Sequence, residues 1–226
     1  MNPPLKILYE DNHLLVVEKP VNVPSQADSS GDPDLLTLLK KDLKERYQKP
    51  GNVYLGLVHR LDRPVGGVMV FAKTSKAAAR LSEQIKAKRE FIKIYRAVIF
   101  GTMEQPSGTL RHFLLKTPEE NIVNVVSKTE PGAKEAILDF QVMDTKGGLS
   151  LVQINLQTGR SHQIRVQFAA AGRPLYGDQK YGAGKSKPGE QLALWATELQ
   201  FPHPTKNEPV YFRSTPPAVY PWNLFA

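Results

Sequence analysis

The sequence is organised around the stretch Gly56-Leu57-Val58-His59-Arg60-Leu61-Asp62-Arg63-Pro64-Val65-Gly66-Gly67. The apolar run Val68–Ala72 follows it and predicts a buried strand, and residues 53–58 before it also read as a strand. Asp62 therefore lies on a connection between two core elements, where scaffolds commonly hold functional residues. Arg60 and Arg63 flank it, and nearby cations favour an ionised carboxylate. The pattern indicates a nucleophile or charge stabiliser, although a structural ion pair would leave the same pattern.

A second polar cluster reads Leu156-Gln157-Thr158-Gly159-Arg160-Ser161-His162-Gln163-Ile164-Arg165-Val166. Apolar residues recur at helical spacing within and after it, which predicts a helix with Thr158 as its N-cap and Gly172 at its end. Arg165 would project from the flank of the apolar stripe, with His162 on the same side. Lone arginines are usually solvated, but an arginine placed here also suits a clamp for a carboxylate or phosphate.

These motifs resemble those of the RluA family of RNA pseudouridine synthases over almost the whole chain. The matching blocks, in family order, are Leu8–Asp11 with Val17–Pro20, His59–Asp62, Lys93–Ala97, Thr158–Arg165, and Gly177-Asp178 with Tyr181-Gly182. Five ordered blocks are far more specific than one four-residue match. The resemblance implies an isomerase that converts specific uridines of structured RNA to pseudouridine, with ribosomal RNA favoured over transfer RNA as the substrate.

The resemblance also implies the roles of individual residues. Asp62 matches the catalytic aspartate, which would either attack the anomeric sugar carbon or remove a proton from the neighbouring sugar carbon. Tyr95, which the strand pattern alone would make a core tyrosine, matches the tyrosine that stacks on the target base. Arg165 matches the basic residue that pairs with the aspartate. Arg60 would help to extrude the target nucleotide. The substrate-binding set that we expect is His59, Arg60, Arg160 and His162.

One departure from the family lies next to Asp62. The family usually has Thr-Ser-Gly where this chain has Val65-Gly66-Gly67, so two hydroxyl groups are missing. Glycine opens backbone conformations that serine does not, which affects the details of the catalytic loop. Because Asp62, Tyr95 and Arg165 all match, we expect an active enzyme.

Composition is consistent with an RNA partner. The 226 residues include 30 Lys+Arg and 22 Asp+Glu, a net charge of +8, and phosphates attract such a surface. The absence of cysteine excludes disulfides and thiolate metal sites. With no apolar run of about 18 residues and no leader pattern, we expect a cytoplasmic protein without a membrane span. We expect no metal and no cofactor, because the rearrangement has no net redox change, and a monomer, because sustained heptads are absent.

Mixed strands and segregated helices predict an α+β fold. We expect helices at residues 34–47 and 75–89, strands at 14–18, 94–100, 136–143, 149–155, 192–201 and 209–213, and a loop at 183–189. The resemblance implies one catalytic domain over residues 1–226, with a central mixed, largely antiparallel sheet flanked by helices. The first family block begins so early that we expect no N-terminal S4 RNA-binding domain.

Two other functions compete with this interpretation. A catalytically silent RNA-binding protein of the same fold would explain the basic charge and tolerate the altered loop. An unrelated hydrolase that uses Asp62 with His162 would explain only these two residues, and the chain has neither a G-x-S-x-G elbow nor a cysteine nucleophile.

Overall fold

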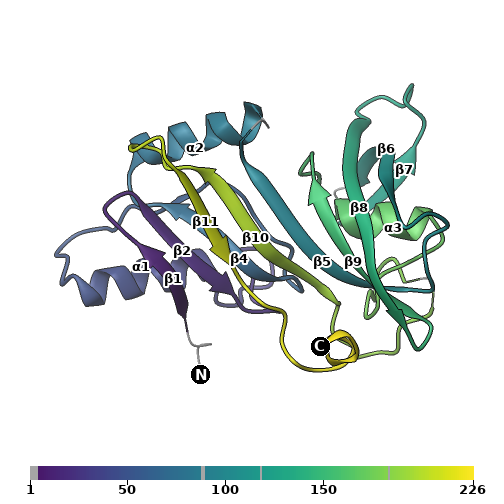
Figure 1. Ribbon diagram of the computed structural model, residues 1–226. Coiled ribbons are helices and arrows are strands. Elements are labelled where there is room, and N and C mark those ends of the chain that lie inside the picture. The colour runs from purple at the N-terminus through teal and green to yellow at the C-terminus, as the bar shows by residue number, and fades with distance from the viewer. Residues whose placement is uncertain (1–4, 88–89, 118, 183) are drawn as a thin grey trace. The chain divides into compact units, whose positions relative to one another are not determined.

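The computed structural model describes residues 5–87, 90–117, 119–182 and 184–226. The chain forms two compact units (Figure 1). The first unit comprises Met1–Ile92 and Ala196–Thr215, and the second comprises Lys93–Trp195 and Pro216–Ala226. The elements of these described residues make the α+β fold that the sequence predicts, with mostly antiparallel strands and three α-helices.

The first unit contains two helices and a set of strands. Its elements are β1 (Lys6–Glu10), β2 (Leu14–Lys19), α1 (Leu35–Arg46), β3 (Gly56–Leu57), β4 (Gly66–Ala72), α2 (Ser75–Ala87), most of β10 (Leu194–Pro202) and β11 (Pro209–Arg213). The strand order is β1-β2-β4-β10, with β3 on β4 and β11 on β10, and Figure 1 shows the four strands side by side. Every residue of β4 is buried, as its continuous apolar run predicts.

The second unit is built on a five-stranded array. Its elements are β5 (Ile92–Phe100), β6 (Ser107–Thr117), β7 (Ile122–Val126), β8 (Lys134–Lys146), β9 (Leu149–Leu156), α3 (Gln163–Ala170) and the 3-10 helix η1 (Trp222–Phe225). The strands follow the order β5-β9-β8-β6-β7, and each neighbouring pair is antiparallel. Helix α3 packs against β6 and β7.

Local sequence explains α1 well. The Asp34 side chain caps the helix by accepting a 3.0 Å hydrogen bond from the backbone N–H of Thr37. Leu35, Leu39 and Leu43 recur on one side and are all buried, so the predicted apolar face is confirmed. The predicted helix at 75–89 is confirmed as α2 over the described residues, and its last two positions lie outside them.

Two predicted boundaries were wrong. The strand expected at 53–58 is reduced to Gly56–Leu57, because only these residues pair with β4. Thr158 is not an N-cap: its hydroxyl donates to the Gln163 side chain at 2.8 Å and accepts from the backbone N–H of Ile137 at 2.8 Å. The helix begins at Gln163 after His162, which has a left-handed backbone conformation with φ of 52°.

Candidate active site

The loop that carries Asp62 is fixed by backbone contacts to the segment that follows β2. The Ser25 hydroxyl donates a 2.7 Å hydrogen bond to the Leu61 carbonyl and accepts one from the Leu61 N–H at 3.2 Å. The N–H of Asn22 donates to the Arg63 carbonyl at 2.8 Å. Asp62, which is half-buried, therefore lies between two anchored residues, so its carboxylate is presented from a constrained backbone.

Lys19 places a buried amine beneath this loop. Its side chain is completely buried, and Nζ donates to the carbonyl oxygens of Pro20 at 2.9 Å and Arg63 at 3.0 Å. Burial lowers the pKa of Lys19 to about 7, and the Asp62 carboxylate opposes this shift while the Arg63 charge adds to it. Lys19 is therefore close enough to Asp62 to interact with it electrostatically.

The arrangement of arginines around Asp62 differs from the prediction. The Arg63 guanidinium is ion-paired with Asp32 and donates to the Ser30 hydroxyl at 3.1 Å and the Asn22 carbonyl at 3.2 Å. Arg60 is exposed. The sequence suggested that Arg63 faces Asp62. In the structure the Arg63 side chain is held by Asp32, which lies thirty-one positions earlier in the chain on another loop.

His59 also has a structural contact on this loop. Its Nε2 accepts a 3.1 Å hydrogen bond from the N–H of Val70 in β4, which assigns the proton to Nδ1. The ring meets Phe91 edge-on, with centroids 6.1 Å apart. His59 thus ties the loop to β4, and its predicted contact with the substrate stays a prediction.

Gly67 is the residue of the family's Thr-Ser-Gly pattern that this chain keeps. Its φ is +119°, and a Cβ on this residue would collide with the backbone of Ala196 in β10. Glycine is therefore required here for two reasons, the backbone conformation and the close approach of two strands. The preceding Val65 is buried in the core, and its N–H donates to the Asp62 carbonyl at 3.0 Å. The turn is closed without the two missing hydroxyl groups.

Arg165 in the second unit is clamped rather than solvent-facing. Its Nε and Nη2 donate to the two carboxylate oxygens of Asp178 at 2.8 and 2.7 Å, and the guanidinium carbon lies 5.1 Å from the centre of the Tyr181 ring. Both side chains of the ion pair are buried. The sequence pattern left a solvated arginine and an anion clamp open for this residue, and the structure shows a clamp on the Asp178 carboxylate.

Asp178 is a positioning residue to which the sequence analysis gave no role. Burial tends to raise the pKa of Asp178, but the Arg165 guanidinium and the backbone N–H groups of Tyr181 and Lys180 hold it below its ordinary value. Asp178 stands in the family block Gly177-Asp178, which is the signal that could have identified it.

The remaining predicted residues also belong to the second unit. Tyr95 is buried in β5 and pairs with Ile154 of β9. His162 Nδ1 lies 2.6 Å from the Tyr181 hydroxyl, and that hydroxyl accepts from the N–H of Val123 at 3.0 Å. Arg160 is exposed, and its Nε donates to the Glu135 carbonyl at 3.0 Å.

The predicted residues are divided between the two units. His59, Arg60 and Asp62 share one loop of the first unit, whereas Arg160, His162 and Arg165 share one turn and helix start in the second unit. No group of three or more histidine, cysteine or acidic side chains in the described ranges could hold a metal ion. No helix in those ranges is both long and apolar enough to cross a membrane.

Comparison with known proteins assigns the family. The model of the RNA pseudouridylate synthase family matches residues 13–170, a range that includes Lys19, Asp62, Tyr95 and Arg165. The chain belongs to the RluA family of RNA pseudouridine synthases. It is an isomerase that modifies RNA.

Relatives of this RluA-family synthase extend over most of its length. It is 36% identical to the uncharacterized RNA pseudouridine synthase YhcT of Bacillus subtilis, over 95% of this chain and 69% of that one. It is 31% identical to the ribosomal large subunit pseudouridine synthase D of Xanthomonas campestris, over 92% of this chain and 64% of that one.

A solved structure shows the same fold. The structure of human RNA pseudouridylate synthase domain containing 4 matches with a TM-score of 0.78 at 22% identity, over 94% of this chain and 88% of that one.

Proposed function

We propose that this synthase isomerises a uridine of ribosomal RNA and that Asp62 is its nucleophile. The observation that carries the assignment of Asp62 is the loop geometry: the residues on both sides of the aspartate are anchored, and the Lys19 amine lies close to its carboxylate. A carboxylate that is held in place with a nearby cation is suited to act as an anion. Relatives named as ribosomal large subunit synthases C and D, at 34% and 31% identity, support ribosomal RNA.

The chemistry begins at the glycosidic bond. In one route the Asp62 carboxylate attacks the anomeric carbon, and the bond to the uracil nitrogen breaks with its electron pair moving onto the uracil. In the other, the carboxylate removes a proton from the neighbouring sugar carbon, and the uracil leaves to give a glycal. In both, the uracil turns and its carbon 5 bonds to the anomeric carbon. This breaks the bond to Asp62 in the first route, and in the second the abstracted proton returns to the neighbouring sugar carbon. Carbon 5 then loses its proton to solvent, and the uracil nitrogen that left the sugar takes one up. Both routes need an ionised carboxylate at Asp62.

Arg165 and Tyr95 complete the proposed machinery. Arg165 is the basic residue that the family resemblance assigns to the catalytic machinery, and its orientation is fixed by the two hydrogen bonds to Asp178. A charge that is already positioned does not have to be reoriented, with its surroundings, when the reaction takes place. Tyr95, held in β5 by pairing with β9, stacks on the target base. His59, Arg60, Arg160 and His162 contact the substrate RNA.

The substrate class is tested by release of tritium from carbon 5 of uridine in unmodified transcripts. Ribosomal and transfer RNA transcripts would be labelled separately and incubated with the native protein. We expect tritium release to reach a stoichiometric plateau with ribosomal RNA. Release from transfer RNA alone would contradict the ribosomal assignment. Binding of both RNAs without release from either would favour the silent RNA-binding alternative.

A further inference from the structure

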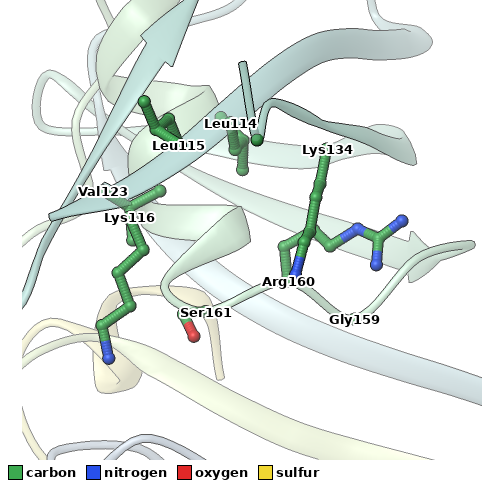
Figure 2. Close-up of a pocket in the computed structure, with 9 residues that line it drawn as sticks. Leu114, Leu115, Lys116, Val123, Lys134, Gly159, Arg160 and Ser161 are labelled. Carbon is green, nitrogen blue, oxygen red and sulfur yellow. The ribbon is translucent and has the colours of Figure 1, made fainter. Parts of the chain in front are cut away.

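The second unit has a pocket of about 300 Å³ on the side formed by β6, β7 and the loop before α3. Figure 2 shows its lining: Val123 and Lys116 lie on one side, Lys134 and Arg160 on the other, with Leu114 and Leu115 above and Ser161 below. The lining residues are Leu114, Leu115, Lys116, Val123, Gly132, Lys134, Gly159, Arg160 and Ser161. None of the residues assigned to the chemistry is among them.

The polar lining of the pocket is strongly cationic. Lys116, Lys134 and Arg160 are all exposed, and none forms an ion pair with a carboxylate in the part of the chain that the structure describes. The neighbouring acid, Glu135, is paired with Arg111 at 2.9 Å, and adjacent strand residues point to opposite faces. Three cations without a carboxylate partner on one small surface attract a phosphate group.

The apolar residues of the lining form a floor that belongs to the packed core. Leu114 and Val123 are each 3% exposed and belong to a buried cluster with Ala136 and Val166. Leu115 is half-buried beside them. A lining that combines apolar and cationic side chains matches a nucleotide, whose base has an apolar face and whose phosphate is anionic.

The loop at Gly159 brings the backbone close to this space. A Cβ on Gly159 would lie 3.3 Å from Nζ of Lys93, which places another amine beside the same loop. Gly132, with φ of +83°, forms the opposite lining next to Leu115. Glycines in a pocket wall allow a ligand to approach the main chain. The pocket volume lies at the small end of ligand sites, which suits one nucleotide rather than a helical segment.

We propose that this pocket binds one unpaired nucleotide of the substrate RNA, other than the target uridine. Its phosphate groups lie between Lys116, Lys134 and Arg160, and its base lies on the apolar floor. The proposal rests on the proposed function, since RNA is the substrate, and it adds Lys116 and Lys134 to the residues that recognise it. The pocket contributes affinity and takes no part in the chemical step.

The test uses a double variant, Lys116→Gln with Lys134→Gln, and a single-stranded oligouridylate of about ten nucleotides as the probe. The matched control is Lys41→Gln with Lys44→Gln on α1, which removes the same charge from exposed positions. We expect the pocket variant to bind about tenfold more weakly than native protein, with a salt slope lower by about 1.4 for two lost phosphate contacts. The control variant should change neither the affinity nor the salt slope. A pocket variant that binds like the control would overturn the proposal.

The role of the base is tested with a duplex RNA of about ten base pairs. Because a paired base cannot enter the pocket, we expect the pocket variant to lose much less affinity for the duplex than for the oligouridylate. Equal losses with both probes would contradict a nucleotide pocket and would indicate a general phosphate-binding surface.

Two readouts separate this proposal from the proposed function. Binding of the oligouridylate requires no turnover, so a native protein that binds without tritium release would refute the proposed function and leave the pocket result valid. At saturating ribosomal RNA, the pocket variant should release tritium in a single turnover at the native rate, within about twofold. A large loss of that rate at saturation would contradict a role in binding alone.

Discussion

The ammonium group of the fully buried Lys19 donates a 3.0 Å hydrogen bond to the carbonyl oxygen of Arg63. Arg63 directly follows Asp62, so this bond ties the end of β2 to the loop that carries the proposed nucleophile. A second bond, to the Pro20 carbonyl at 2.9 Å, fixes the same amine. The family block at Val17–Pro20 therefore contributes to the site by holding the loop and placing a charge near it.

Replacing this amine should impair the reaction more than the fold. Lys19→Met keeps an unbranched side chain of similar length but removes both hydrogen bonds and the charge near Asp62. We expect the single-turnover rate of tritium release to fall at least about tenfold, equivalent to about 1.4 kcal/mol of lost transition-state stabilisation. Circular dichroism would verify folding. Lys6→Met, at an exposed position in β1, is the control and should keep the native rate. A native rate for Lys19→Met would show that the amine is dispensable.

The lowered pKa of Lys19 also predicts that the stability of the protein depends on pH. The pKa of Lys19 is about 7 in the folded protein, because burial disfavours the ammonium, against an ordinary value of 10.5. Between these values the unfolded chain binds a proton that the folded chain lacks, so stability rises with pH, on the order of 1 kcal/mol per pH unit. Urea unfolding at several pH values should show native stability increasing relative to Lys19→Met above about pH 7. A constant difference across this range would contradict the lowered pKa.

The buried pair of Arg165 and Asp178 predicts a large effect of neutralising the acid. Asp178→Asn keeps the shape but leaves the buried guanidinium without its counter-charge, which should lower the free energy of unfolding by about 3 kcal/mol. The matched change Asp144→Asn removes an exposed carboxylate paired with Lys146 and should leave stability nearly unchanged. Urea titrations measure the free energy of unfolding of both variants. Similar small losses for the two variants would mean that the buried pair does not stabilise the fold.

Gly67 is the residue of the family's Thr-Ser-Gly segment that this chain retains. Gly67→Ala should destabilise the protein by more than about 2 kcal/mol, because the new methyl group meets the Ala196 backbone at a strained φ. Gly51→Ala is the control, since nothing lies within 4 Å of its would-be Cβ. Thermal unfolding compares the variants. Equal melting temperatures would argue against the close approach of β4 and β10 at this position.

The sequence predicted elements best where short-range signals decide them. The Asp34 cap and the buried leucines of α1 needed no tertiary information, and the apolar run of β4 identified a buried strand. Strands β6 and β7 were not predicted, because most of their residues are exposed or half-buried and lack a clear apolar alternation.

The contacts at the site were harder to predict, because they depend on partners distant in sequence. Arg63 pairs with Asp32, and the carboxylate that Arg165 clamps is that of Asp178. The burial of Lys19 likewise arises from the packing of β2 against β4, which its local sequence does not reveal. Family motifs identified the blocks, and only the structure identified the contacts within each unit.

The central claim, that Asp62 carries out the first step of uridine isomerisation, is tested most directly by Asp62→Asn. Native and variant proteins would be compared in a single-turnover assay of tritium release from ribosomal RNA, with RNA binding measured in parallel. The account predicts release by the native protein, none above background by the variant, and retained RNA binding by both. Release by Asp62→Asn at the native rate would contradict it.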